Sequence, residues 1–164
     1  MVVLDERKTG ASGVLGRGKE IVCTVNKILN IKMQNDKLKF KNEFKKRLYN
    51  FTLKLIEFID KLSNDNVSRR MGDQLLRSGT SILGNYVEGQ SSSSRKDFIN
   101  FFNHSLKSTN ESKLWIAILR DSKRAKDIDV GWFLKELDEI LNIFASSILT
   151  LKGKKYFFIF YMSF

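Results

Sequence analysis

From residue 36 onward, apolar residues recur at intervals of three and four, which is the spacing of one face of an α-helix. The first segment ends near the polar stretch SNDN. Its apolar row is Phe40, Phe44, Leu48, Phe51, Leu55, Phe58 and Leu62. This row predicts a first helix that begins at Asp36.

Three further segments have the same periodicity, at about 67–87, 95–122 and 132–151, and the sequence KRAKDIDVG between the last two predicts a loop. The second stripe is Met71, Leu75, Ser78, Ile82 and Tyr86. The third is Phe98, Phe101, Phe102, Ser105, Ser108, Thr109, Ser112, Trp115, Ile116 and Leu119, and the fourth is Phe133, Leu137, Ile140, Leu141, Phe144, Ile148 and Leu151. Because proline is absent and the connections are short, we predict an all-α fold, an antiparallel up-and-down four-helix bundle over residues 36–152.

Both ends of the chain differ from this pattern. Residues 1–35 are rich in glycine early and predict a poorly ordered N-terminal extension; alternatively, they precede the true coding start, with Met33 as the natural first residue. Residues 153–164 form an aromatic C-terminal tail that is too short to span a bilayer, and we expect a frayed end. With no secretory signal and no apolar span, the sequence predicts a soluble cytoplasmic protein.

The middle of the second helix is built from small residues. Ser78, Gly79, Ser81 and Gly84 occupy positions where a core usually needs bulk, and each glycine costs about 1 kcal/mol of helix propensity relative to alanine. Close approach of a neighbouring helix is the expected compensation.

The segment NYVEGQSSSSRKDFINFF joins the second and third helices. We expect Gly89 to end the second helix as a left-handed C-cap and the serines to supply oxygens to the amides that begin the third. Ser94 and Asp97 have the spacing of a capping box. The segment lacks the GxxxxGK[ST] spacing of a nucleotide-binding loop, so the sequence supports a single phosphate contact at most.

Charge points to a polyanionic partner. The chain has 29 basic and 18 acidic residues, and residues 37–122 alone hold 16 basic and nine acidic ones. A polar stripe, Lys96, Asn100, Asn103, Lys107 and Asn110, runs along the third helix opposite its apolar side. Pairs four residues apart, Glu43 with Arg47 and Glu57 with Lys61, would neutralise part of the charge. We predict phosphate contacts from Lys37, Lys41, Lys45, Arg70, Arg77, Arg95, Lys96 and Lys107; the alternative is a basic surface that only aids solubility.

Few residues are suited to catalysis. Cys23 and His104 are the only cysteine and histidine, so one chain has neither a disulfide nor a histidine-based metal cluster. Glu88 and Glu111 are the carboxylates of most interest, but without Glu-x-x-His motifs a structural role is preferred over a di-metal site. We predict no cofactor, no metal and no enzymatic activity.

A family resemblance rests on the segment from Leu75 to Leu119. The matching residues include Arg77, Ser78, Ser81, Asn85, Glu88, Gly89, Ser94, Asp97, Phe98, Lys107, Glu111 and Trp115. They resemble the four-helix-bundle family of 23S ribosomal-RNA intervening-sequence proteins, whose relatives include the accessory variability determinant of diversity-generating retroelements. The likeness covers about residues 36–152, with Ser112 where threonine is usual and with many aromatic residues in the fourth helix.

This resemblance implies a basic, ring-shaped homopentamer of four-helix bundles. For the retroelement relatives it also implies binding of nucleic acid and of a reverse transcriptase, without catalysis by the bundle. Our leading hypothesis is therefore a non-enzymatic RNA- or DNA-binding bundle. A scaffold for an acidic partner protein is the second, and the third is an enzyme with a pocket joining Glu88, Glu111 and His104.

Overall fold

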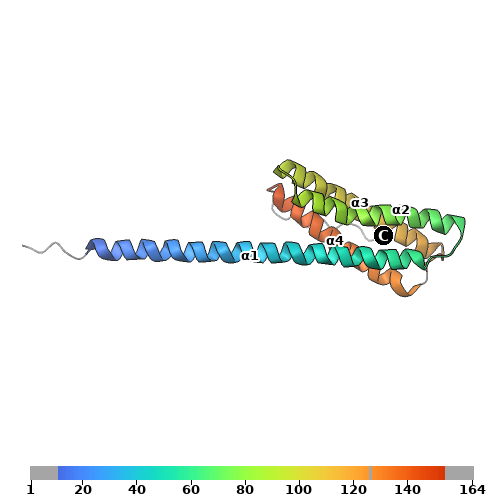
Figure 1. Cartoon of the computed structure of the whole chain (residues 1–164), viewed down its shortest axis with the longest axis horizontal. Coiled ribbons are helices and arrows are strands. Elements are labelled where there is room, and N and C mark those ends of the chain that lie inside the picture. The colour runs from blue at the N-terminus through green and yellow to red at the C-terminus, as the bar shows by residue number, and fades with distance from the viewer. Residues whose placement is uncertain (1–10, 126, 154–164) are drawn as a thin grey trace, which may run out of the picture. The chain divides into compact units, whose positions relative to one another are not determined.

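The computed structural model describes residues 11–125 and 127–153. This part of the chain forms four helices, α1 (Ala11–Asp60), α2 (Asn66–Gln90), α3 (Arg95–Asp121) and α4 (Asp127–Leu151) (Figure 1). The chain divides into two compact units, residues 1–43 and 44–164, and α1 contributes residues to both. The predicted all-α four-helix architecture is confirmed.

The first unit contains the N-terminal part of α1, which is already helical at Ala11 rather than from Asp36 as predicted. All described side chains from Asn26 to Glu43 are exposed. Phe40, which the periodicity placed on the buried row, is 54% exposed, so that assignment was wrong. Apolar spacing indicates which face of a helix is suited to burial, but a helix without proline can extend beyond the stretch that is buried. The poor order proposed for residues 1–35 stays a prediction.

The second unit is the bundle, in which α1 (from Phe44), α2, α3 and α4 each run antiparallel to the next. Along α1 the residue numbers of the contacts rise while those of α2 fall: Phe44 contacts Tyr86, and Leu55, further along α1, packs against Gly79. Likewise, Tyr86 meets Phe102 while Ser78 meets Ser112. The predicted up-and-down order of the helices therefore holds within this unit.

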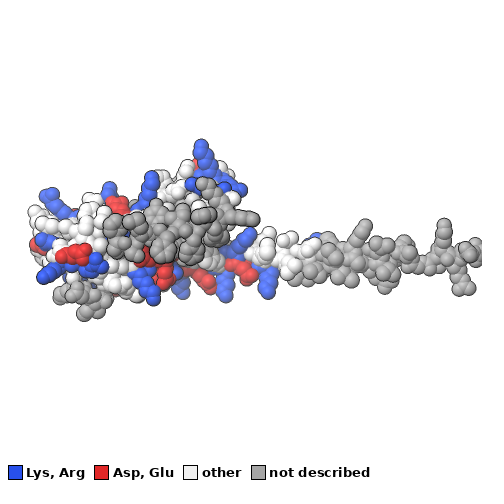
Figure 2. Space-filling view, turned by 180° about the vertical axis from the view of Figure 1, so that it is seen from behind, with Lys and Arg blue, Asp and Glu red and all other residues white. Residues whose placement is uncertain are grey.

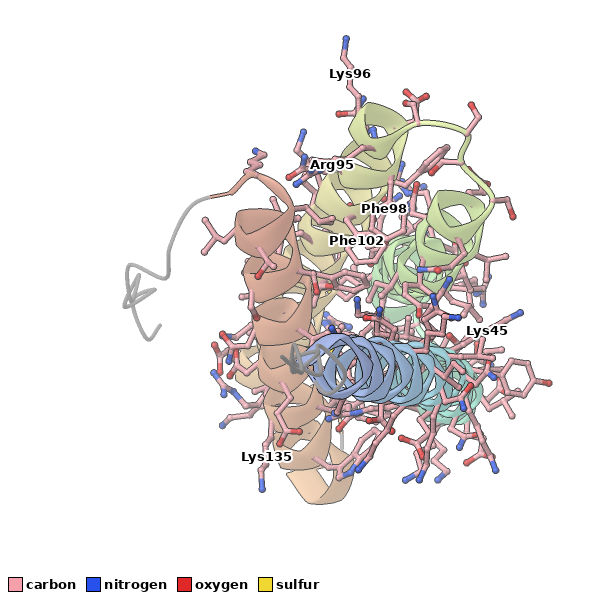
Figure 3. The ribbon with its side chains drawn as sticks, turned by 90° about the vertical axis from the view of Figure 1, so that its left-hand side faces the viewer. Lys45, Arg95, Lys96, Phe98, Phe102 and Lys135 are labelled. Atoms are coloured by element: carbon pink, nitrogen blue, oxygen red, sulfur yellow. The ribbon has the colours of Figure 1, made fainter. Side chains whose placement is uncertain are left out.

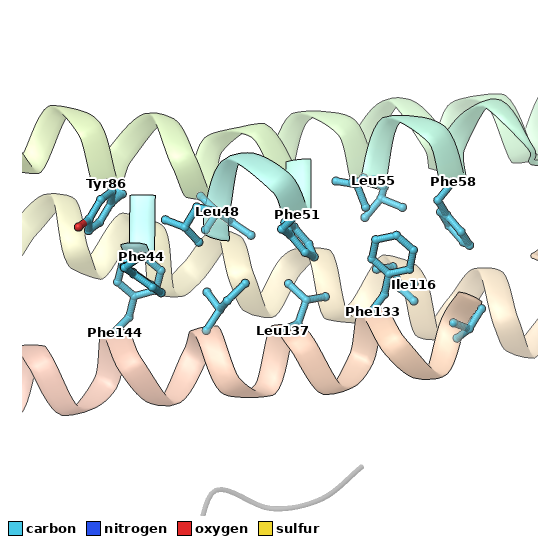
Figure 4. Close-up of a cluster of buried hydrophobic side chains, with 14 of the residues drawn as sticks. Phe44, Leu48, Phe51, Leu55, Phe58, Tyr86, Ile116, Phe133, Leu137 and Phe144 are labelled. Atoms are coloured by element: carbon cyan, nitrogen blue, oxygen red, sulfur yellow. The ribbon is translucent and has the colours of Figure 1, made fainter. Parts of the chain in front are cut away.

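The core of the bundle is rich in aromatic rings (Figure 4). Phe44, Tyr86, Phe102 and Phe144 form one group of ring contacts, with centroids 5.2–6.3 Å apart. Edge-to-face pairs of this kind add about 0.5–1.5 kcal/mol beyond the apolar area they bury. The remaining buried apolar residues are Leu48, Phe51, Leu55, Phe58, Leu75, Ile82, Ile116, Leu119, Ala125, Val130, Phe133, Leu137, Ile140 and Ile148.

The small residues of α2 allow close packing on two sides. A Cβ added to Gly79 would lie 2.0 Å from Leu55 Cδ2. On the other side, Ser112 Oγ of α3 donates a 2.9 Å hydrogen bond to Ser78 Oγ. The predicted close approach is thus confirmed at Ser78 and Gly79. It was wrong for Gly84, which is exposed and has nothing within 4 Å of an added Cβ.

The corner between α2 and α3 differs from the prediction at Gly89. This glycine lies inside α2 and is buried, and the C-cap is Ser91 in a right-handed conformation. The absence of a side chain at Gly89 makes room for α3, because an added Cβ would lie 3.1 Å from Phe101 Cβ. Ser92 Oγ donates to the Gly89 carbonyl, so this serine satisfies the end of α2 rather than the start of α3.

The start of α3 confirms the predicted cap. Ser94 Oγ accepts a 3.1 Å hydrogen bond from the Asp97 backbone N–H and donates a 2.6 Å bond to Asp97 Oδ2. Asp97 thus reaches back to the cap residue and places its negative charge at the positive end of the helix.

Two polar networks connect helices distant in sequence. Asp65 caps α2 and accepts a 2.5 Å hydrogen bond from Arg124, which follows α3. Hydrogen bonds from the Ser68 hydroxyl and backbone N–H lower the pKa of Asp65 to about 2, with Val67 N–H and Arg124 contributing. Such a carboxylate stabilises the fold most when it is ionised.

The second network joins α1 to α4. Arg47 donates to Glu136 at 2.6 and 2.8 Å and to Glu139 at 2.5 Å. The hydrogen bond to Glu136 is the main reason that the pKa of Arg47 is raised. Glu43, its predicted helical partner, instead lies 3.9 Å from Lys39.

The α3–α4 connection is shorter than predicted, because α4 begins at Asp127 instead of near Trp132. Val130 is only 2% exposed and extends the buried row of Phe133 and Leu137 by one turn. Gly131 in the same turn weighed against a helix in the sequence, but it faces open space and is tolerated there. None of the described helices has the length and apolar character needed to cross a bilayer.

Candidate nucleic-acid interface

A polar stripe covers the outer side of α3. Lys96, Asn100, Lys107 and Asn110 are exposed, and Asn103 is half-buried among them. The stripe arises because residues three and four apart share one helical face, while Phe102, Ser105 and the other buried positions of α3 face the core. From Lys96 to Asn110 it extends about 21 Å along the helix at 1.5 Å per residue. It presents two ammonium groups and three amides, all hydrogen-bond donors.

The stripe begins at the first turn of α3, where Arg95 and Lys96 project from the same end of the helix (Figure 3). Arg95 Nη2 donates a hydrogen bond to the Leu151 carbonyl at the end of α4. This bond holds the guanidinium over the α4 C-terminus, and Lys96 extends into solvent. Phe98 points inward and its ring contacts that of Phe102 in a tilted arrangement, with centroids 4.3 Å apart.

Arg77 is occupied by an ion pair within the chain. Its Nη2 lies 3.0 Å from Glu111 Oε1, so the pair links α2 to α3 on the bundle surface. The side chains are 67% and 40% exposed, which makes this a weak, screened interaction. Glu111 therefore offsets one of the predicted phosphate contacts.

The other predicted cations lie elsewhere. Lys45 and Arg70 are exposed on α1 and α2, and Figure 3 shows Lys45 on a different side of the bundle from Arg95 and Lys96. Lys37 and Lys41 are exposed and belong to the first unit rather than to the bundle. In Figure 2, acidic side chains lie beside many of the basic ones, so the visible face is not uniformly positive. The structure thus brings Arg95, Lys96 and Lys107 together on one helix and separates them from Lys45.

The other residues of the family resemblance have architectural environments. Asn85 Nδ2 donates a 2.8 Å hydrogen bond to the Ser81 carbonyl one turn earlier in α2. Trp115 is half-buried against the core, and its indole N–H has no hydrogen-bond partner among the described residues. Ser78 and Gly89, by contrast, lie directly at the contact between α2 and α3.

The groups considered for catalysis are dispersed. Glu88 and His104 are exposed, and Glu111 is paired with Arg77. Within residues 11–125 and 127–153, no three histidine, cysteine, aspartate or glutamate side chains are grouped to hold a metal ion. The side chain of Cys23 lies outside the described residues.

Sequence reasoning gave no role to Lys54 and Trp132, which the structure brings together. Lys54 Nζ of α1 lies 4.1 Å from the centroid of the Trp132 ring in the first turns of α4. Trp132 is 40% exposed although it neighbours buried Phe133. The fourth helix was predicted to start at Trp132 because Gly131 comes directly before it, so the turn that precedes Trp132 in α4 was missed.

Comparison with known proteins gives a consistent result. The family model described as 23S rRNA-intervening sequence protein matches residues 41–146. A crystal structure of a protein of unknown function from the S23 ribosomal protein family of Bacteroides thetaiotaomicron is 30% identical, with a TM-score of 0.61. The match covers 66% of this chain and 96% of that one. Among curated proteins, none matches.

Proposed function

Because the chain belongs to the 23S rRNA-intervening sequence protein family, we propose that it is a non-enzymatic bundle that binds RNA or DNA through the outer face of α3. The polar stripe from Lys96 to Asn110 carries this proposal. Its five positions hold lysine and asparagine and no acid. Lysine and asparagine side chains are common donors to phosphate oxygens.

The stripe suits contact with a nucleic-acid backbone more than base readout. The strand of a duplex winds around its axis, so a straight stripe of about 21 Å follows one strand for only a few phosphates. A straight α-helix that carries spaced donors binds such a strand by charge and hydrogen bonds, without sequence preference. A single cysteine in the chain fits a reducing cytoplasm as the location.

Charge-removal variants of equal size test the role of α3. We compare Lys96→Gln/Lys107→Gln with Lys46→Gln/Lys135→Gln, which removes two exposed lysines from α1 and α4. Lys135 lies on another side of the bundle from Lys96 (Figure 3). In a gel-shift titration of a labelled RNA, the α3 variant is expected to lose affinity clearly more than the control. Equal losses would refute α3 as the interface and leave only a diffuse charge effect.

A protein scaffold is the second candidate, and the paired cations favour it. Arg47, Arg77 and Lys113 all hold carboxylates of a neighbouring helix, which reduces the charge left for a polyanion. A scaffold for an acidic protein, such as a reverse transcriptase, would retain that protein in a pull-down and show negligible affinity for nucleic acid alone. The gel shift and the pull-down, done side by side, distinguish the two functions.

The family resemblance also motivates a homopentamer as the binding form. Exposed apolar side chains support it: Tyr49, Leu53 and Ile56 on α1 are 40–54% exposed and recur at helical spacing. Residues at intervals of four and three form one stripe, which a second copy can cover. Sedimentation velocity at micromolar concentration is expected to show a species near five times 19.0 kDa, and a 19.0 kDa species alone would refute the assembly.

A further inference from the structure

A cavity opens between the end of α1 and the start of α4, apart from the α3 stripe. Its volume is about 350 Å³, and it is lined by Lys54, Glu57, Phe58, Lys61, Trp132 and Phe133. We call it the Trp132 cavity. Phe58 and Phe133 are buried and form its floor, with ring centroids 5.1 Å apart. Of the three charged residues, Lys54 and Glu57 come from α1, and Lys61 follows directly after its end.

The ring of Trp132 is held in place on its inner side and reachable from outside. Phe133 meets it edge-on at 4.9 Å, and Phe51 lies roughly parallel to it at 6.4 Å. The ring is nevertheless 40% exposed, and the ammonium of Lys54 stands over it at 4.1 Å from its centroid. An oriented, exposed indole is therefore combined with a cation at the same cavity.

Lys54 and Glu57 lie three residues apart on α1, and Lys61 comes directly after its last residue, Asp60. The backbone N–H of Lys61 donates to the Phe58 carbonyl, so Lys61 continues the last turn of the helix. A carboxylate between two ammonium groups disfavours a free phosphate at the centre of the cavity. It favours a flat ring with hydrogen-bond donors there and negative charge at the edges.

We propose that the Trp132 cavity binds one unpaired nucleobase of a single-stranded nucleic acid, an inference that rests on the proposed function. The base stacks on the exposed face of Trp132. Lys54 leaves that face and contacts a flanking phosphate. Glu57 accepts from an exocyclic amino group, as carboxylates do from cytosine N4.

Energetics favour the exchange at the ring. An exposed cation–π contact is weaker than the stacking of a base on an aromatic ring. Stacking of a base on an aromatic side chain contributes about 1–3 kcal/mol per base, and the displaced ammonium gains a phosphate. A duplex has no unpaired base to stack on Trp132 and therefore gains no affinity from the cavity. The cavity thus gives the protein a preference for single strands.

The test uses the full chain and two labelled probes, a 12-nucleotide RNA of alternating C and U and a blunt 12-base-pair RNA duplex. Trp132→Leu, which keeps an apolar side chain at this position but removes the π face, is expected to weaken binding of the single strand by about 5- to 150-fold. Binding of the duplex is expected to change by less than about twofold, because the backbone contacts that bind it remain. Trp132→Phe keeps a ring for stacking and is expected to retain most of the affinity.

A fluorescence titration reports on the cavity without altering it. In Trp115→Phe, Trp132 is the only tryptophan, and stacking of a base is expected to quench its emission on addition of the single strand. Two results together would overturn the cavity proposal: Trp132→Leu binds the single strand as tightly as the unaltered chain does, and the emission of Trp115→Phe is not quenched. If the unaltered chain binds both probes in that case, the proposed function stands. If the unaltered chain binds neither probe, both fall. Quenching by an acidic peptide but not by RNA would assign the cavity to a protein ligand and overturn the proposal.

Discussion

Replacing Gly79 with alanine tests how closely α2 packs on the C-terminal part of α1. The new Cβ would lie 2.0 Å from Leu55 Cδ2, well inside van der Waals contact. Leu55 is fully buried, so its side chain can move away from the new methyl group only by repacking against other core residues. Overpacking of this kind costs about 1–3 kcal/mol.

Helix propensity acts in the opposite direction, since alanine exceeds glycine by about 1 kcal/mol within a helix. We therefore expect Gly79→Ala to lower the free energy of unfolding by up to about 2 kcal/mol. Gly84→Ala is the matched control. It lies in the same helix but has nothing within 4 Å of its added Cβ, so the propensity gain of about 1 kcal/mol is expected in full.

The assay is urea unfolding followed by circular dichroism at 222 nm, at one fixed protein concentration. The two variants are expected to differ by about 1–3 kcal/mol, with the denaturant m-value unchanged. If both substitutions stabilise the protein to the same extent, α2 and α1 are not in close contact at Gly79, and our account of the small residues in α2 is wrong.

Three further substitutions probe the polar groups of the bundle. Asp65 has its pKa lowered to about 2 from 3.8, so its contribution to stability is complete above pH 4 and is lost as the pH falls toward 2; Asp65→Asn is expected to flatten the thermal-melting profile in that window. Arg47→Met removes the link to Glu136 and Glu139 and is expected to cost about 1–2 kcal/mol in urea unfolding, whereas Lys46→Met at the exposed neighbouring position stays near zero. Trp115→Phe deletes an indole N–H without a hydrogen-bond partner in the described structure and is expected to cost less than about 1 kcal/mol; a loss above 2 kcal/mol would indicate a missed partner.

Periodicity was sufficient to predict the four helices and most of the core. Leu75, Ile82 and Tyr86 of α2 are buried where the stripe predicted, because a helix in a bundle faces its neighbours with one side only. Phe40 shows the limit of that argument. Its spacing matches the buried row, but burial depends on which partner helix is present at that level, and a single helical pattern carries no such information.

Glycine was the least predictable residue type, because one residue serves several purposes. Gly79 and Gly89 permit close approach, Gly84 and Gly131 face open space, and Gly153 alone among the described glycines has a positive φ, of 69°. Sequence context suggested a cap at Gly89 and a loop at Gly131, and neither is found. The start of α4, and with it the neighbourhood of Trp132, was missed for this reason.

Charged contacts between helices also escaped prediction. Arg47 is four residues from Glu43, and the local rule for helical pairs favours that partner. The bidentate contact with Glu136 of α4 has better geometry and is less exposed, so it prevails. Which lysines remain available to a ligand therefore follows from the assembled bundle, and only the α3 stripe could be identified from its own sequence.

The salt dependence of RNA binding tests the central proposal most directly. Fluorescence anisotropy of a labelled RNA with the full chain, measured from about 50 to 200 mM NaCl, is expected to show log K falling linearly with log salt concentration. Lys96→Gln/Lys107→Gln is expected to reduce the magnitude of that slope by about two, one for each phosphate that is no longer neutralised. Binding that stays constant across this range, or no binding at its low-salt end, would contradict a protein that holds nucleic acid through the cations of α3.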